Sequence, residues 1–253
     1  MGCILTTFLL IVAPCNSQAQ SVVPMENVGT SMSSSIFLAA KLSSSVFFQD
    51  FALEYYRKAD NCKQIGYVPS KNRTIKIADA LWTACQIKPE VGTWVPYKGA
   101  PGPEWRPYYM FTLMMTESGG KSHNTSKPKE KTYGFCCVSI TEARGVCYVH
   151  HMACPKYDAD IVEKLQNDLS WAATIALRAW ESYAGECKGD IMAGLMCYKY
   201  GTAKYATLLD NYHGNIKACE QYGYFMRKLD TVRCAITQMG FYDGCLCFNG
   251  DNI

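Results

Sequence analysis

The chain has 253 residues, of which 49% are hydrophobic and 19% are charged, and its formal net charge is +3. This composition provides enough apolar surface for a substantial core and excludes a collagen, a coiled coil and a wholly disordered chain. A net charge this small does not indicate the strongly basic face that is typical of nucleic-acid-binding proteins. We therefore expect a globular protein without a nucleic-acid partner.

The first residues of the chain indicate export. Residues 3–13 form an uncharged, largely apolar run, which is followed by Pro14 and by an A-x-A-like segment at residues 17–19. This pattern is typical of a signal peptide cleaved after Ala19, although no lysine or arginine precedes the run. The run is too short for a transmembrane helix, which needs about 20 apolar residues. We expect residues 1–19 to be a signal peptide; a buried or membrane-lying N-terminus is the alternative.

Cysteine is unusually frequent, with 14 residues in the chain, and removal of Cys3 and Cys15 with the leader leaves an even number, twelve. In an exported protein this frequency indicates disulfides, whose pairing cannot be read from the sequence. A zinc site is the alternative, formed by the closely spaced residues Cys147, His150, His151 and Cys154. No second half with Cys-x-x-Cys spacing accompanies them, so we expect disulfides, with no bound metal and no other cofactor.

Apolar residues at three- and four-residue spacing predict helices over residues 45–58 and 74–87, separated by a loop at 66–72. The segment 88–107 then contains five prolines and three glycines, a composition that indicates an internal boundary. We therefore expect residues 20–104 to form an N-terminal helical extension, with a loose lead-in before its first helix.

The next segment predicts a buried helix that ends in an acid. Pro107 suits a first helical position, and the residues after it are almost all apolar until Glu117, which precedes a Gly-Gly stop. Apolar surroundings and the negative end of the helix both disfavour a carboxylate, and no cation is adjacent in sequence before Lys121. We expect the pKa of Glu117 to be raised; the alternative is an ordinary glutamate that points into solvent.

Further helices follow. Ser139 and Glu142 form a capping box that begins a short helix, and residues 160–184 predict one long helix with Trp180 in the core. Asp190 caps a helix over 191–200 that Gly201 ends, and residues 215–232 predict a last amphipathic helix. The lysine-rich loop at 121–133 either attracts an acidic polymer or is simply solvated. We expect residues 216–253, with a tail from 240 onward held by a disulfide, to pack on the same domain.

Several short motifs occur in a fixed order between residues 105 and 210. They are Glu117-Ser118, Gly134-Phe135-Cys136-Cys137, the segment Ser139–Ala143, the segment Asp168–Ala172 and the segment Met196–Gly201. Together they resemble the lytic transglycosylase domain of the goose-type lysozyme superfamily. In that family a helix ends in Glu-Ser, a Gly-Leu-Met-Gln stretch follows, and an Ala-Ala-Tyr-Asn-Ala-Gly motif comes later.

The resemblance implies a mainly α, lysozyme-like fold, here with disulfides, and a catalytic domain over residues 105–215. It implies Glu117 as the catalytic residue, and it carries substrate binding to Ser118, Gly134, Phe135, Cys137, Tyr198, Lys199 and Tyr200. The chain departs from the family at three of these positions, because Cys137 replaces a glutamine, Lys199 an asparagine and Tyr200 a small alanine. These departures change the hydrogen bonds that the site can offer a sugar.

The function implied by the resemblance is cleavage of the β-1,4 bond between N-acetylmuramic acid and N-acetylglucosamine in peptidoglycan, with a 1,6-anhydro product. One carboxyl group suffices for this reaction, acting first as acid and then as base. A goose-type hydrolase on the same scaffold is one alternative. A catalytically inactive cell-wall-binding or virion structural module is another. The expected partner is the peptidoglycan strand, within a cell envelope or a phage assembly, and the expected location is periplasmic, extracellular or virion-associated.

Overall fold

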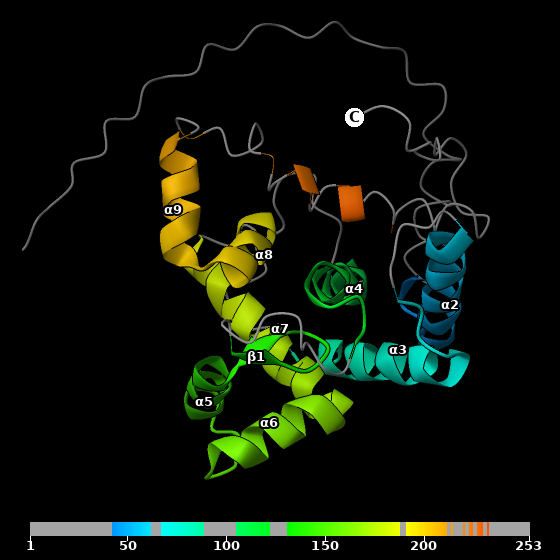
Figure 1. Cartoon of the computed structure of the whole chain (residues 1–253), viewed down its shortest axis with the longest axis horizontal. Coiled ribbons are helices and arrows are strands. Elements are labelled where there is room, and N and C mark those ends of the chain that lie inside the picture. Colours follow the sequence, from blue (N-terminus) through cyan, green and yellow to red (C-terminus); the bar gives the residue numbers. More distant parts are fainter. Residues whose placement is uncertain are drawn as a thin grey trace, which may run out of the picture.

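In a computed structural model the protein is mainly helical, with a single short hairpin in the described part of the chain (Figure 1). The structure describes residues 42–61, 67–88, 105–121, 131–187 and 191–211, together with 214, 220, 223–224, 227–229 and 232. The helices are α2 (Ser45–Asn61), α3 (Lys71–Cys85), α4 (Arg106–Glu117), α5 (Ile140–Val149), α6 (Asp158–Asn167), α7 (Leu169–Glu186), α8 (Ile191–Tyr200) and α9 (Thr202–Asn211). The strands β1 (Thr132–Tyr133) and β2 (Val138–Ser139) pair antiparallel.

Helix α7 is the centre of the fold, and it packs against α3, α5, α6 and α8 (Figure 1). Small side chains on its buried faces, such as Ala173 and Ala176, allow neighbouring helices to come close. Helix α8 approaches α7 closely, because a Cβ atom on Gly194 would lie 2.8 Å from the Cα of Ala184. The position of α8, which carries Tyr198 and Lys199, is therefore set by backbone contact with α7.

Helix α4 is buried along its length, as the apolar run predicts, and residues 106–116 are all buried. Its aromatic side chains pack on those of α2. Phe48 meets the ring of Tyr108 edge-on at 5.1 Å, and Phe51 meets the ring of Phe111 in the same way at 5.1 Å. Such edge-to-face pairs stabilise beyond the apolar area that they bury. The helix that ends in Glu117 is thus held by residues from the N-terminal part of the chain.

A buried ion cluster fixes the other end of α4. Arg106 and Glu181 form an ion pair in which each side chain is only 2% exposed. Arg106 Nη1 also donates to the carbonyl oxygen of Cys85 at 2.9 Å, and Arg178 Nη1 lies 3.1 Å from Glu181 Oε2. Buried charges need such partners to offset their lost hydration. The cluster ties α3, α4 and α7 together.

Some predicted helix ends agree with the structure, whereas the helices predicted over 45–58 and 74–87 span residues 45–61 and 71–85. The capping box is present, since Ser139 Oγ accepts from the amide of Glu142 at 3.1 Å and Glu142 Oε2 accepts from the amide of Ser139 at 3.0 Å. Helix α8 spans residues 191–200 as predicted, and Gly201 follows it at a φ of 81°. Trp180 is buried in the core, as expected.

The single long helix predicted over residues 160–184 is wrong. Two helices, α6 and α7, occupy this region, and they are separated at Asp168. Asp168 has an extended backbone, and its Oδ1 accepts from the amide of Trp171 at 2.9 Å, which makes it the N-cap of α7. Helix α9, over residues 202–211, is a further element that the sequence analysis does not contain.

Several expectations concern residues that lie outside the described ranges. These are the signal peptide and most of the lead-in within 1–41, the proline-rich segment at 89–104, the lysine-rich residues at 122–130, most of the predicted helix over 215–232, and the tail from 240 to 253. Among the helices that are described, none combines the length and the apolar character needed to cross a membrane.

The described cysteines are thiols in this structure, so the disulfides expected from the cysteine count stay a prediction. The thiols are those of Cys85, Cys136, Cys137, Cys147, Cys154, Cys187 and Cys197. Burial and a hydrogen bond with Cys154 raise the pKa of the Cys147 thiol to about 12. No group of three or more His, Cys, Asp or Glu side chains in the described ranges is placed to hold a metal ion, so the zinc alternative gains no support.

Candidate active site

Glu117 is the last residue of α4, and its side chain is only 11% exposed. The helix ends there because two amides, those of Ser118 and Gly119, both bond to the carbonyl oxygen of Met114, at 3.0 and 3.1 Å. Gly119 follows at a φ of 65°, a left-handed conformation that glycine adopts without strain. The alternative in which Glu117 points freely into solvent therefore does not fit the structure.

A cation from a distant part of the chain contacts this carboxyl group. Lys199 Nζ donates to Glu117 Oε1 at 3.1 Å and to the carbonyl oxygen of Thr116 at 2.9 Å. A lysine ammonium is well placed at the C-terminus of a helix, where it meets the negative end of the helix dipole. A positive charge at this distance also favours the carboxylate form over the neutral acid. The prediction of a raised pKa for Glu117 was based on apolar surroundings, the negative end of the helix and the lack of a cation nearby in sequence, and it did not include this contact.

The turn between β1 and β2 forms the second part of the site. Gly134 begins it at a φ of 75°, and a side chain there would overlap the carbonyl oxygen of Leu165 in α6. Cys137 ends it at a φ of 54°, and its amide donates to the carbonyl oxygen of Gly134 at 3.2 Å. The tight turn places the carbonyl groups of Phe135 and Cys136 against α4 and α8.

Two hydroxyl groups bind these carbonyl oxygens. Ser118 Oγ donates to the carbonyl oxygen of Phe135 and accepts from the amide of Gly120 at 3.0 Å. Tyr198 Oη donates to the carbonyl oxygen of Cys136 at 2.9 Å. Together with the Lys199 contact, these bonds bring the end of α4, the β1–β2 turn and the end of α8 into one cluster.

Tyr198 is a neutral hydrogen-bond donor in this cluster. Burial raises its pKa well above the ordinary value, and the carboxyl groups of Glu142 and Glu117 raise it further. Its ring packs edge-on against Tyr183, with 6.2 Å between ring centres, and Tyr183 Oη donates to Glu142 Oε1 at 2.9 Å. Glu142, the glutamate of the capping box, thus also supports the position of Tyr198 through Tyr183, a role that its sequence position alone does not reveal.

The other predicted substrate-binding residues lie in different surroundings. The side chains of Phe135 and Cys137 are buried, so both belong to the packed interior behind the turn. Tyr200 is half-buried at the end of α8, and Lys204 Nζ lies over its ring at 5.2 Å from the centre. Ser118, Tyr198 and Lys199 are therefore the predicted residues whose polar groups gather around the end of α4.

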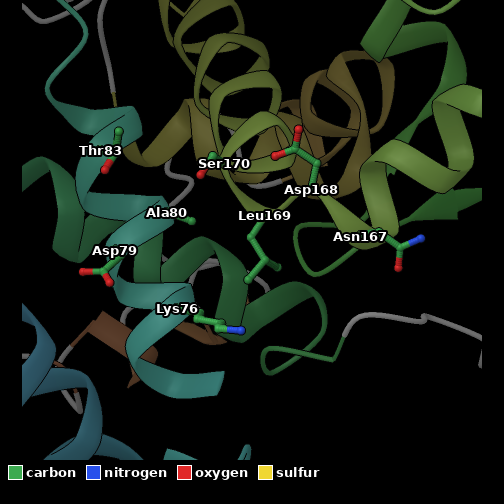
Figure 2. Close-up of a pocket in the computed structure, with 8 residues that line it drawn as sticks. All are labelled: Lys76, Asp79, Ala80, Thr83, Asn167, Asp168, Leu169 and Ser170. Atoms are coloured by element: carbon green, nitrogen blue, oxygen red, sulfur yellow. The ribbon is translucent and has the colours of Figure 1, made fainter. Parts of the chain in front are cut away.

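Figure 2 shows a cleft elsewhere on the molecule, between α3 and the junction of α6 and α7. Its volume is about 490 Å³. The lining residues are Lys76, Asp79, Ala80 and Thr83 from α3, and Asn167, Asp168, Leu169 and Ser170 from the α6–α7 junction. Glu117 does not line this cleft. The sequence analysis does not identify it, because charged and hydroxyl residues on exposed helix faces give no distinguishing pattern.

Comparisons of this chain with protein-family models, with curated proteins and with solved structures find no significant match.

Proposed function

We propose that this protein is a peptidoglycan lytic transglycosylase with a lysozyme-like helical domain and Glu117 as its catalytic residue. One observation carries the proposal. The three segments that hold the key motifs, at Glu117-Ser118, at residues 134–137 and at residues 198–199, are far apart in sequence yet contact one another through specific hydrogen bonds. A chance set of weak motifs has no reason to converge around the acid on which the chemistry depends.

In this proposal Glu117 first acts as an acid. It protonates the oxygen of the leaving sugar while the acetamido group of the substrate assists departure. As a carboxylate it then accepts the proton of the C6 hydroxyl group, which closes the 1,6-anhydro ring without water. The reaction needs one carboxyl group, in contrast to most glycosidases, which use two. The fixed end of α4, held by Lys199 and Ser118, supports this role because acid–base transfer needs a positioned group.

Lys199 has a defined place in the proposed mechanism. Its ammonium stabilises the carboxylate that the first proton transfer produces, so it makes Glu117 a stronger proton donor in the first step and a weaker proton acceptor in the second. Substrate binding must offset the same interaction in the first step, because the acid has to be neutral there. Lys199 is thus proposed as a positioning residue for Glu117, in place of the asparagine of the family.

The ion pair also favours a second candidate function. A glutamate that Lys199 keeps permanently ionised cannot donate a proton, and the protein would then be a cell-wall-binding or virion structural module. A hydrolase that releases a reducing end is the third reading of the same site. In each of these three proposals the protein is exported and associates with a cell envelope or a phage particle.

Digestion of purified peptidoglycan distinguishes the candidates. The wild-type protein is compared with Glu117→Gln and with Glu163→Gln, a control on the exposed face of α6. The proposal expects soluble fragments with anhydro ends from the wild type and the control, identified by mass spectrometry, and none from Glu117→Gln. Reducing ends would indicate a hydrolase. Sedimentation with intact peptidoglycan but no release of fragments would indicate a binding module.

A further inference from the structure

Two cysteines face each other where α7 meets α8. Cys187 is the C-cap of α7, and its amide donates to the carbonyl oxygen of Tyr183 at 3.0 Å. Cys197 lies in α8 and is 1% exposed. Their Sγ atoms are 3.4 Å apart. A disulfide bond is about 2.05 Å long, so the two sulfur atoms are within about 1.4 Å of bonding distance.

The backbone around these cysteines already holds the two helices close enough for a cross-link. Helices α7 and α8 are in direct contact at Ala184 and Gly194, three residues before each cysteine. The end of α8 is closed by a bond from the amide of Gly201 to the carbonyl oxygen of Cys197 at 2.8 Å. Rotation of the two side chains can therefore close the remaining distance while both helices stay in place.

We propose that Cys187 and Cys197 form a disulfide that joins the end of α7 to α8. The oxidant is a disulfide of a small thiol or of a thiol–disulfide oxidoreductase. The Cys187 thiolate, which is the more exposed, attacks this disulfide, forms a mixed disulfide and releases one thiol. The Cys197 thiolate then attacks the Cys187 sulfur and displaces the second thiol. Two electrons pass from the protein to the oxidant, and the two protons of the cysteines end on the two released thiols.

The cross-link would act directly on the candidate site. Cys197 immediately precedes Tyr198 and Lys199, which bond to the carbonyl oxygen of Cys136 and to Glu117. A covalent bond at Cys197 fixes this part of α8 against α7, and thereby limits the movement of both site residues. The positions of the two sulfur atoms and the contact between the helices do not depend on whether the protein cleaves peptidoglycan.

Peptide mapping of the full chain tests the proposal. The protein is incubated with oxidised glutathione, unfolded without reductant in the presence of an alkylating reagent, and digested with trypsin. Cleavage after Arg178, Lys188 and Lys199 gives the peptides 179–188 and 189–199, each with one cysteine. We expect these two peptides to be joined in wild-type protein and to separate when reductant is added.

Two results would overturn the proposal. One is alkylation of both cysteines in the oxidised wild-type protein, and the other is linkage of either cysteine to a different partner. Cys187→Ser is the matched control, in which peptide 189–199 is expected to carry the alkyl group or glutathione. The mapping reads the wild-type chain itself, so the result does not depend on whether the variant folds.

Discussion

Lys199 Nζ lies 3.1 Å from Glu117 Oε1, although 82 residues separate the two in sequence. The side chains are 19% and 11% exposed, so water screens the contact only in part. An ammonium beside a carboxylate makes the neutral acid a stronger proton donor and the carboxylate a weaker base. This relationship sets the pH range in which Glu117 can act as the proton donor of the proposed reaction.

Replacement of the lysine should change that range. In Lys199→Met the neutral acid persists to higher pH because the ammonium is gone, so we expect the descending limb of the pH–rate profile for peptidoglycan release to move to higher pH. Lys204→Met removes an exposed lysine of α9 and should leave the limb in place. An unchanged limb in Lys199→Met would contradict the role given to this contact.

The β1–β2 turn should tolerate no side chain at its first position. Gly134→Ala introduces a Cβ at a φ of 75° and against the carbonyl oxygen of Leu165, so we expect a loss of at least about 2 kcal/mol in the free energy of unfolding. Gly145→Ala is the control, because this residue lies inside α5 and a Cβ added there would meet no atom within 4 Å apart from its chain neighbours and the backbone of its own helix. The free energy of unfolding of that variant should rise by about 0.5 to 1 kcal/mol. Urea unfolding measures both, and equal effects would refute the turn argument.

The buried ion cluster should be sensitive to loss of its acid. Glu181→Leu leaves the Arg106 guanidinium buried without a carboxylate, and we expect a loss of about 3 to 5 kcal/mol in the free energy of unfolding. Asp158→Asn breaks an exposed pair with Arg144, whose side chains are 67% and 44% exposed, and should cost less than about 1 kcal/mol. Denaturant titrations of the two variants give the comparison. A small effect at Glu181 would mean that the cluster is hydrated.

Removal of two buried tyrosine hydroxyls should change the stability of the protein in opposite directions. In the described part of the chain Tyr108 Oη is buried without a hydrogen-bond partner, whereas Tyr198 Oη donates to the carbonyl oxygen of Cys136 at 2.9 Å. Tyr108→Phe should therefore leave stability unchanged or raise it by about 1 kcal/mol, and Tyr198→Phe should lower it by about 1 kcal/mol. Thermal unfolding of both variants, followed by circular dichroism, tests the difference in sign.

Alkaline pH should destabilise the fold. Burial raises the pKa of the Cys85 thiol and of the Tyr55, Tyr56 and Tyr108 phenols above their ordinary values. The folded state therefore holds these protons more tightly than the unfolded state, whose groups titrate at about 8.5 for thiols and about 10 for phenols. The associated stability is complete below pH 8 or so and is lost as pH rises further. The urea midpoint should fall steadily above about pH 9, and a constant midpoint up to pH 11 would contradict the burial of these groups.

The parts of the fold that depend on local sequence were predictable, and those that depend on distant contacts were not. The apolar run before Glu117 indicates a buried helix, and the Ser139–Glu142 capping box needs only residues within one turn. The break at Asp168 was missed because the apolar spacing continues across it, although aspartate is a common N-cap residue. Contacts such as Lys199 with Glu117 require the packing of α8 on α7 and have no signal in sequence spacing.

The ring contacts of Phe48 and Phe51 with α4 bear on how this protein can be divided for study. A recombinant fragment that starts at Trp105 would contain every residue assigned to the acid's surroundings, yet it would leave one flank of the α4 helix open to water. Exposed apolar faces promote self-association in solution. Boundaries for expression and crystallisation should therefore be placed ahead of Ser45, because α2 covers the side of α4 that such a fragment would expose.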